Sequence, residues 1–158
     1  MSSPAPSVVA ALESLGLEHR VLVHTAPVRS LEEAAAARGV DVVDVVKTLV
    51  VRRGEGDYLF VLVPGGRSIS WPKLRGLLGV SRMSMPPADE AFAATGFERG
   101  TITPIGSATA WPVVADVVLA SRREITLGSG VHEVAIAVQA LPFLEAVGAV
   151  VADVTDPE

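Results

Sequence analysis

The chain has 158 residues, of which 49% are apolar, 20% charged and 4% aromatic, and it carries a net charge of −5 at neutral pH. This length favours a single domain over residues 1–158, and the apolar content excludes a disordered chain. The absence of cysteine excludes disulfide frameworks and thiolate chemistry, while the lack of a signal peptide and of any apolar run of about 18 residues leads us to expect a cytoplasmic protein with no membrane partner.

The predicted elements alternate between helices and strands. In chain order they are a helix at 7–15, a strand at 18–23, a helix that begins after Ser30 and ends at Gly39, strands at 46–52 and 58–63, a helix at 70–78, a short strand at 82–85, a helix at 87–95, strands at 111–118, 124–127 and 133–138, a helix at 139–147 and a strand at 149–154. The spacing of Ser30 and Glu33 is that of a capping box. The two central strands predict a hairpin, which requires antiparallel pairing. The sequence therefore predicts one α/β domain, with a mixed, largely antiparallel central sheet flanked by helices.

Charge is distributed unevenly along the chain. Residues 47–99 carry eight basic and five acidic side chains, a net charge of +3, whereas the rest of the chain has a net charge of −8. A small basic patch on an acidic body could receive one anionic end of a larger partner, although a solvated charged face gives the same pattern. The overall negative charge argues against a protein that grips nucleic acid along its whole surface.

Lys47 lies at the start of the first hairpin strand. In strand alternation it shares a face with Leu49 and Val51, where a cation either extends from the strand end to solvent or lines a pocket. The next residue, Thr48, either lines such a pocket with its hydroxyl or is simply a strand residue. Lys47 is the charge that we expect to act together with the loop described next.

A loop rich in glycine, threonine and proline, residues 95–106, connects two structured halves. Gly100 and Gly106 permit backbone angles that other residues disfavour, and Pro104 pushes Thr103 toward an extended conformation. The remaining amides can then point into one concavity, which would suit an oxygen anion or a carbonyl group. A plain surface connection is the alternative interpretation.

Several kinds of catalytic site have no counterpart in the sequence. The histidines, His19, His24 and His132, do not have metal-ligand spacing, so we expect no metal and no cofactor. The chain has no G-x-S-x-G nucleophile elbow, no G-x-x-x-x-G-K-[ST] phosphate loop and no carboxylate pair with glycosidase spacing. An enzyme of this sequence would have to use oriented amides, one lysine and groups of its own substrate.

Four segments follow one another along the chain: 46–51 around Lys47, the loop with Gly100 and Pro104, the run at 128–130, and 150–154. In this order they resemble the YbaK/prolyl-tRNA synthetase-associated domain family, whose members are aminoacyl-tRNA editing domains. The resemblance covers roughly residues 20 to 155. It implies a YbaK-like domain.

The resemblance implies a freestanding trans-editing hydrolase, which cleaves the ester between a wrong amino acid and the 3′ end of a tRNA. The amino acid would be small, with tRNA-Pro as one candidate carrier. Lys47 would hold the 3′-terminal adenosine or its phosphate, amides from Gly100 to Pro104 would face the aminoacyl group, and a ribose hydroxyl would position the water. Besides these catalytic positions, the residues expected to bind the substrate are Thr48, Thr103, Ile105, Gly106, Gly128, Ser129, Gly130 and His132.

Two features complicate this resemblance. Many relatives carry a serine-alanine-glycine run where this chain has Gly128-Ser129-Gly130, so a hydroxyl is missing or displaced by one position. His132 follows soon after, and some branches place a histidine near the pocket, while an exposed strand-end histidine is the alternative. The altered run leaves open a non-catalytic module that binds an aminoacyl or nucleotide ligand and associates with a synthetase. Hydrolysis of a small ester unrelated to tRNA is a third hypothesis.

Overall fold

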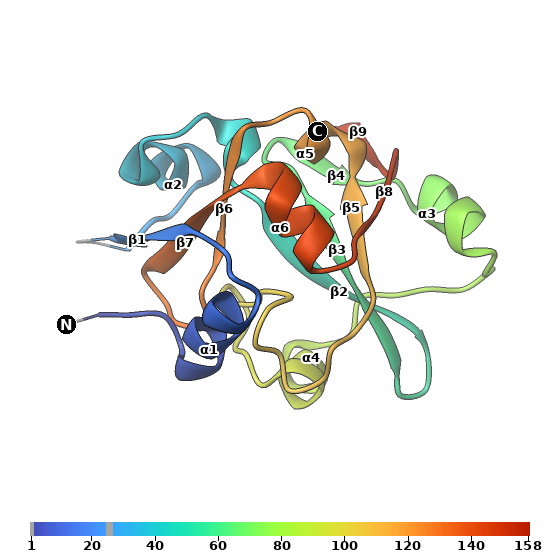
Figure 1. Cartoon of the computed structure of the whole chain (residues 1–158). Coiled ribbons are helices and arrows are strands. Elements are labelled where there is room, and N and C mark those ends of the chain that lie inside the picture. Colours follow the sequence, from blue (N-terminus) through green and yellow to red (C-terminus); the bar gives the residue numbers. More distant parts are fainter. Residues whose placement is uncertain (1, 25–26) are drawn as a thin grey trace.

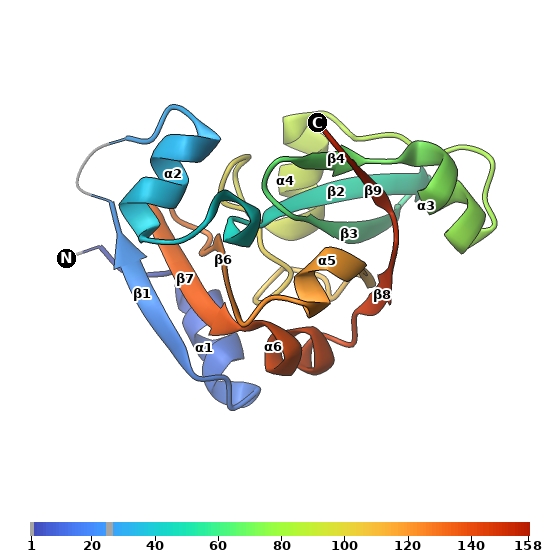
Figure 2. The ribbon, with the colours of Figure 1, turned by 90° about the horizontal axis from the view of Figure 1, so that it is seen from above.

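The computed structural model describes residues 2–24 and 27–158, which form short helices around three small sheets (Figure 1). The helices are α1 (Pro6–Ser14), α2 (Leu31–Arg38), the 3-10 helix η1 (Val42–Asp44), α3 (Trp71–Leu78), α4 (Ala88–Thr95), α5 (Val117–Ala120) and α6 (Ala140–Ala146). The strands are β1 (His19–Val23), β2 (Lys47–Gly54), β3 (Asp57–Val63), β4 (Arg67–Ile69), β5 (Val113–Asp116), β6 (Glu124–Gly128), β7 (Val134–Gln139), β8 (Val150–Ala152) and β9 (Thr155–Pro157). Helices α2 and α3 lie at opposite ends of the molecule, and α6 lies between them (Figures 1 and 2).

The predicted hairpin forms the start of the largest sheet. Strands β2 and β3 pair antiparallel, with Lys47 opposite Val63, and β5 and β8 extend the sheet by parallel pairing in the order β2-β3-β5-β8. Strands β1, β7 and β6 form an antiparallel sheet, and β4 and β9 form a two-stranded one. The amide of Val46 donates to the carbonyl of Thr126 at 2.9 Å, which joins the two larger sheets at the start of β2.

The mixed α/β fold with antiparallel sheets and flanking helices is confirmed, but its strands do not form one central sheet. Next to β2, β6 makes only an isolated bridge between Val45 and Thr126 before the two strands part, so the ladder does not continue. The predicted strand at 82–85 is likewise reduced to a bridge between Arg52 and Ser84.

The C-terminal third differs from the predicted elements at two points. The expected strand 111–118 ends at Asp116, because the carboxylate of Asp116 accepts hydrogen bonds from the amides of Val118 at 3.0 Å and Val154 at 3.1 Å. The first of these bonds caps α5, so residues 117 and 118 are helical. The expected strand 149–154 is shorter, and the chain then forms β9 against β4.

Serine side chains cap two of the predicted helices, whereas the helix predicted at 7–15 begins at Pro6 without a side-chain cap. Ser30 Oγ accepts from the amide of Glu33 at 3.0 Å, and α2 ends at Gly39 in a left-handed conformation. The other half of the capping box differs, because the Glu33 carboxylate accepts from the amide of Arg29 at 2.6 Å instead of that of Ser30. Ser70 and Gly79 likewise begin and end α3. The ending at Gly39 places Arg38 in the last turn of α2, which matters for the site.

Alternation along β2 gives the four-stranded sheet two packed faces. Val46 and Val50 belong to the larger core cluster, which also contains residues of α1, α4 and α6. Leu49 and Val51 pack in a second cluster with Leu74 of α3. Because neighbouring strand residues point to opposite faces, Lys47 begins on the α3 side of the sheet and Thr48 on the side of the larger core.

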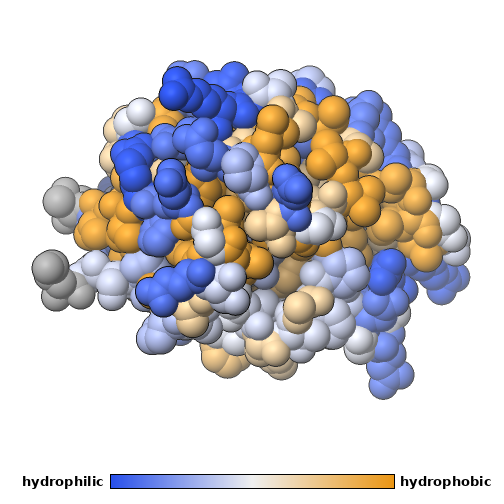
Figure 3. All heavy atoms as spheres, in the orientation of Figure 1, coloured by the Kyte–Doolittle hydropathy of each residue, from blue (hydrophilic) through white to orange (hydrophobic). Residues whose placement is uncertain are grey.

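Apolar surface gathers around α6 and β8 in the view of Figure 3. Its exposed members on α5, α6 and β8 include Val117, Leu141, Val150 and Val151, none of which lines the charged cavity described below. Within the described residues, no helix combines the length and apolarity needed to cross a membrane.

Candidate functional site

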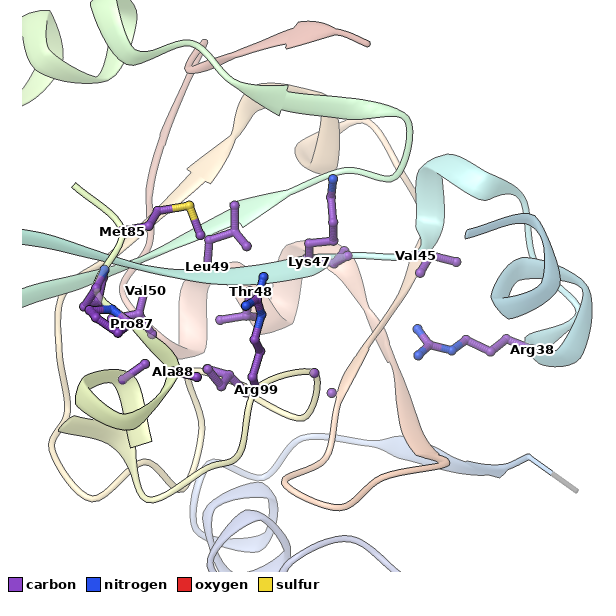
Figure 4. A pocket seen from close by; sticks show the side chains of 16 residues that line it. Arg38, Val45, Lys47, Thr48, Leu49, Val50, Met85, Pro87, Ala88 and Arg99 are labelled. Carbon is purple, nitrogen blue, oxygen red and sulfur yellow. The ribbon is translucent and has the colours of Figure 1, made fainter. Parts of the chain in front are cut away.

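A cavity of about 610 Å³ lies between β2, the chain segment leading into α4, and the loop that follows α4 (Figure 4). Toward α4 its walls are apolar and include Leu49, Val50, Met85 and Pro87. Toward α2 and the loop the walls are polar or formed by backbone; they include Arg38, Thr48, Arg99, Gly100 and Gly128. One cavity therefore combines an apolar end with a charged end.

The charge of this cavity has one sign. Arg38, Lys47 and Arg99 line it, and among the described residues that line it there is no carboxylate. These three cations come from α2, β2 and the loop after α4, so the fold brings them together from distant parts of the chain. On a protein with a net charge of −5, such a cavity is a local attractor for an anionic group.

The ammonium group of Lys47 is turned away from the loop. Its Nζ donates to the carbonyl of Arg67 at 3.1 Å and lies 3.3 Å from Glu158 Oε1, with the side chain 39% exposed. Figure 4 shows Lys47 and Thr48 pointing to opposite sides of β2. The side chain of Lys47 thus contributes to the cavity wall, while its ammonium group contacts the Arg67 carbonyl of β4 and the Glu158 carboxylate.

Thr48 presents a buried polar atom at the cavity. Its Oγ1 is inaccessible to solvent and has no hydrogen-bond partner among the described residues. Its neighbours on this face are apolar, as Val50, Ala91 and Ile102 also line the cavity. A buried hydroxyl without a partner is costly, so this atom is suited to a ligand that supplies one.

The loop 95–106 is divided between two hollows. Gly100 and Ile102 line the charged cavity, and within the described chain their amides donate to no protein acceptor. Pro104, Ile105 and Gly106 instead line a second hollow of about 520 Å³ beside α1 and the end of α6. Only the first part of the loop therefore shares a cavity with Lys47.

Thr103 lies at the division between these two parts. It is fully buried, and its hydroxyl has no partner within the described chain. It lines neither hollow. The structure thus places Thr103, like the three residues that follow it, outside the charged cavity.

The run Gly128-Ser129-Gly130 packs against this loop. A Cβ on Gly128 would come within 2.8 Å of the carbonyl oxygens of Thr101 and Ile102, and the amide of Gly130 donates to Thr101 at 2.9 Å. Ser129 is fully buried, with Oγ 2.7 Å from the carbonyl oxygen of Val134. The glycines allow the two backbones to approach closely, and the Ser129 hydroxyl closes the turn between β6 and β7.

His132 lies at the rim beside Gly100. Its ring is exposed, with Nε2 3.0 Å from Glu98 Oε2, and a Cβ on Gly100 would be 3.8 Å from its Cε1. His132 does not line the cavity. It is therefore placed to contact only a ligand that extends out of the cavity.

Arg38 and Arg99 are site residues that the sequence reasoning did not single out. Arg38 Nη1 donates to Thr126 Oγ1 at 2.9 Å, and burial lowers the pKa of its guanidinium below the ordinary value. It is the last residue of an alanine-rich helix, a position where a basic side chain is typical because it stabilises the helix C-terminus. Arg99 was counted in the basic excess of residues 47–99, but a count of charges does not predict where a side chain points.

His24 is buried close to Arg38 but does not line the cavity. Burial, and then the charge of Arg38, lower the pKa of its imidazole, against an opposing effect of Glu133. Among the described residues no three His, Asp or Glu side chains form a group that could hold a metal ion.

The sequence is similar to that of proteins of known function. The profile of the aminoacyl-tRNA editing domain matches residues 25–143. Proline–tRNA ligases from Thermosipho melanesiensis and Trichlorobacter lovleyi are 32% and 31% identical to the chain over 111 and 107 residues, which is 70% and 68% of it. The chain spans about a fifth of the length of these ligases.

Solved structures match along nearly the whole chain. A candidate trans-editing enzyme for prolyl tRNA synthetase is 30% identical, with a TM-score of 0.87, over 98% of this chain and 99% of its own. A candidate signal transduction protein from Marinobacter aquaeolei VT8 is 16% identical, with a TM-score of 0.69, over 96% of this chain and 31% of its own, and shares the fold alone. Because the profile covers well over half of the chain and the relatives exceed 30% identity, the protein belongs to the aminoacyl-tRNA editing domain family, the YbaK/prolyl-tRNA synthetase-associated domains.

Proposed function

We propose that this protein is a trans-editing deacylase, which hydrolyses the ester between a mischarged small amino acid and the 3′ end of a tRNA, with tRNA-Pro as the first candidate. The observation that carries the proposal is a cavity that is lined by Arg38, Arg99 and the side-chain base of Lys47, with no carboxylate among the described residues that line it, in a member of an editing family. Support for action in trans comes from the neighbour described as a candidate trans-editing enzyme, which matches over 99% of its own chain. The cytoplasm, where aminoacyl-tRNA is used, is the proposed location.

The reaction needs little from the protein beyond orientation and charge. Water adds to the ester carbonyl carbon, the bond from that carbon to the ribose oxygen breaks, and the amino acid and the tRNA hydroxyl are released. The free amides of Gly100 and Ile102 are the proposed donors to the developing oxyanion, and the neighbouring ribose hydroxyl of the substrate is proposed to hold the water. Loss of one such donor typically costs about 3–4 kcal/mol in the barrier.

In this mechanism the Lys47 ammonium first has to exchange its present protein contacts for the substrate. Its ammonium now contacts the carbonyl of Arg67 and the carboxylate of Glu158, both near the exposed end of the side chain. Exposed ion pairs of this kind are weak, so an anionic substrate can compete for the lysine. We propose that Lys47 turns toward the bound 3′ end and holds the terminal adenosine or its phosphate.

The amino acid is proposed to be small because it shares the cavity with the terminal adenosine. The apolar end near α4 and the charged end near α2 offer separate surroundings for the two parts of such a ligand. The sequence and the structure leave cysteine, alanine and serine as equal candidates, and a panel of mischarged tRNAs distinguishes them.

Lys47→Ala tests the assignment. We expect deacylation of the preferred mischarged tRNA to fall about a hundredfold, the size of effect seen when one charge-stabilising group is removed from an active site. The matched control is Arg53→Ala, which removes a cation that pairs with Asp57 at 3.0 Å outside the cavity. An active wild type together with an unchanged rate in Lys47→Ala would refute the role of Lys47.

Two observations support the alternative of a non-catalytic binding module that associates with a synthetase. The Ser129 hydroxyl is used inside its own turn, and the Lys47 ammonium is turned from the loop. The same panel of tRNAs separates the two functions. Saturable binding of an aminoacyl ligand without any deacylation would favour the module, whereas turnover of one substrate favours the enzyme.

A further inference from the structure

Two arginines reach the charged end of the cavity from different elements. Arg38 extends from the last turn of α2, and Arg99 rises from the loop after α4 beside Thr48 (Figure 4). Both line the cavity together with Gly100 and Gly128. The two guanidinium groups therefore approach the same space from the side and from below in this view.

Neither arginine has a carboxylate partner within the part of the chain that the structure describes. Elsewhere on the protein, Arg53 lies 3.0 Å from Asp57, and Arg122 Nε lies 2.6 Å from Asp44. Arg38 makes one side-chain hydrogen bond, to Thr126, while its buried Nε has no partner within the described residues. The fold thus keeps two guanidinium groups without a carboxylate partner at one cavity. For Arg38, which is partly buried, this is costly unless a ligand supplies negative charge, whereas the exposed Arg99 remains solvated.

We propose that Arg38 and Arg99 form a clamp for a phosphate group of the ligand, and that in the RNA substrate this group is a phosphodiester next to the 3′-terminal nucleotide. This inference rests on the proposed function, which it makes more specific by naming the part of the substrate that each arginine meets. Lys47 is not a member of the clamp: its ammonium now lies on the other side of β2 and reaches the 3′ end only if it turns, whereas Arg38 and Arg99 already line the cavity.

The chemistry of the two side chains suits a phosphate, and an amino acid bound as an ester has no free carboxylate to offer them. A guanidinium offers a planar, permanently charged fork that can bind two phosphate oxygens at once. Arg38 is held by Thr126 and is partly buried, so it is already oriented before the ligand binds. Arg99 is exposed at the mouth of the cavity, where it can meet the ligand as it enters. The clamp therefore has one fixed and one adaptable half.

Salt dependence of RNA binding is the test. Fluorescence anisotropy measures the affinity of the wild type, Arg38→Gln and Arg99→Gln for a labelled single-stranded RNA that ends in CCA, over a series of salt concentrations. For each variant we expect affinity to fall about tenfold or more, as when a hydrogen bond to a charged group is removed. We also expect the slope of log affinity against log salt to become shallower by about 0.7 for each phosphate that the variant no longer neutralises.

Two controls separate this role from a structural one. Arg53→Gln makes the same change of charge outside the cavity and is expected to keep the wild-type slope. Thr126→Val removes the hydrogen bond that holds Arg38 but leaves its charge, so it is expected to weaken binding less than Arg38→Gln and to keep the slope. Equal slopes in the wild type and in Arg38→Gln and Arg99→Gln, with all proteins folded, would overturn the proposal.

Competition by AMP and by inorganic phosphate identifies the source of the phosphate. Displacement of the RNA only by another CCA oligonucleotide assigns the clamp to the RNA backbone. Displacement by AMP at similar concentration, abolished in the two variants, assigns it to a free nucleotide phosphate. The test of the clamp is independent of turnover. Binding that depends on the two arginines, without deacylation, would support the clamp and refute the deacylase. Deacylation with unchanged salt slopes in the variants would support the deacylase and refute the clamp.

Discussion

The two parts of the loop 95–106 use glycine in different ways. At Gly100, where φ is +90°, a Cβ would meet only His132 Cε1, at 3.8 Å, and the residue lines the charged cavity. At Gly106, where φ is +72°, a Cβ would lie 2.6 Å from the backbone of Ser7 at the start of α1. The first glycine leaves the wall of the cavity without a side chain, and the second lets the loop pack against a helix. Glycines of one loop therefore line a cavity at one end and allow close packing at the other.

Gly106→Ala should give the largest change in stability. The left-handed conformation disfavours a side chain, and the methyl group would overlap the backbone of Ser7 unless α1 moves. We expect the free energy of unfolding to fall by about 3 kcal/mol, as strain and overpacking combine. Denaturant unfolding measures this change.

Gly100→Ala is the matched variant that sharpens the comparison. It meets no backbone, so we expect a loss of about 1 kcal/mol from the left-handed conformation alone. Its deacylation rate should fall by more than this loss of stability explains, because the methyl group enters the wall where the ester is proposed to lie. Equal losses of stability in the two variants would show that the difference between the two ends of the loop is not real.

The sequence predicted local structure well where a single segment decides it. The caps at Ser30 and Ser70, the glycine that ends α2 and the central hairpin all follow from neighbouring residues, and each is present. The strand ending at Asp116 was missed: the carboxylate of this residue caps α5 through the nearby Val118 and also accepts from Val154, and this second bond is distant in the sequence.

The site was less predictable for the same physical reason. Alternation placed Lys47 on a face with Leu49 and Val51, but nothing local indicated that its ammonium would meet the carbonyl of Arg67. The orientation of Arg38 at the cavity depends on its hydrogen bond to Thr126 of β6, which is distant in the sequence. The excess of basic residues in the middle of the chain and the glycine-rich loop indicated an anion-binding surface, but neither identified Arg38 as part of it.

Two threonines extend the comparison between the cavity and the packed part of the loop. Thr48 and Thr103 each have a buried hydroxyl without a partner in the described part of the chain, but only Thr48 lines the charged cavity. Replacement by valine removes an unsatisfied hydroxyl in a similar shape. We therefore expect both variants to gain about 1 kcal/mol in the free energy of unfolding.

Their effects on the ligand should differ. Thr48→Val is expected to weaken binding of the CCA oligonucleotide or of an aminoacyl ligand about fivefold, as one neutral hydrogen bond is removed, whereas Thr103→Val should leave it unchanged. Thr48→Ser, which keeps the hydroxyl, is expected to bind like the wild type. If Thr48→Val and Thr103→Val bind equally well, the Thr48 hydroxyl does not meet the ligand.

The smallest expected effect is a pH dependence that His24 gives to folding. Burial, followed by the nearby charge of Arg38, lowers the pKa of His24 from its ordinary value of 6.5, so the unfolded chain takes up the proton at a higher pH than the folded one. The contribution of neutral His24 to the free energy of unfolding is therefore complete above about pH 6.5 and is lost as the pH falls toward the lowered pKa. Urea unfolding between pH 7.5 and about 5 should show this loss in the wild type and a flatter profile in His24→Leu. His19→Gln, at an exposed histidine, is the matched control and should keep the slope of the wild type. If the stability of His24→Leu depended on pH as steeply as that of the wild type, the pH dependence would belong to other groups. Burial and the charge of Arg38 would then have no measurable effect on the protonation of His24.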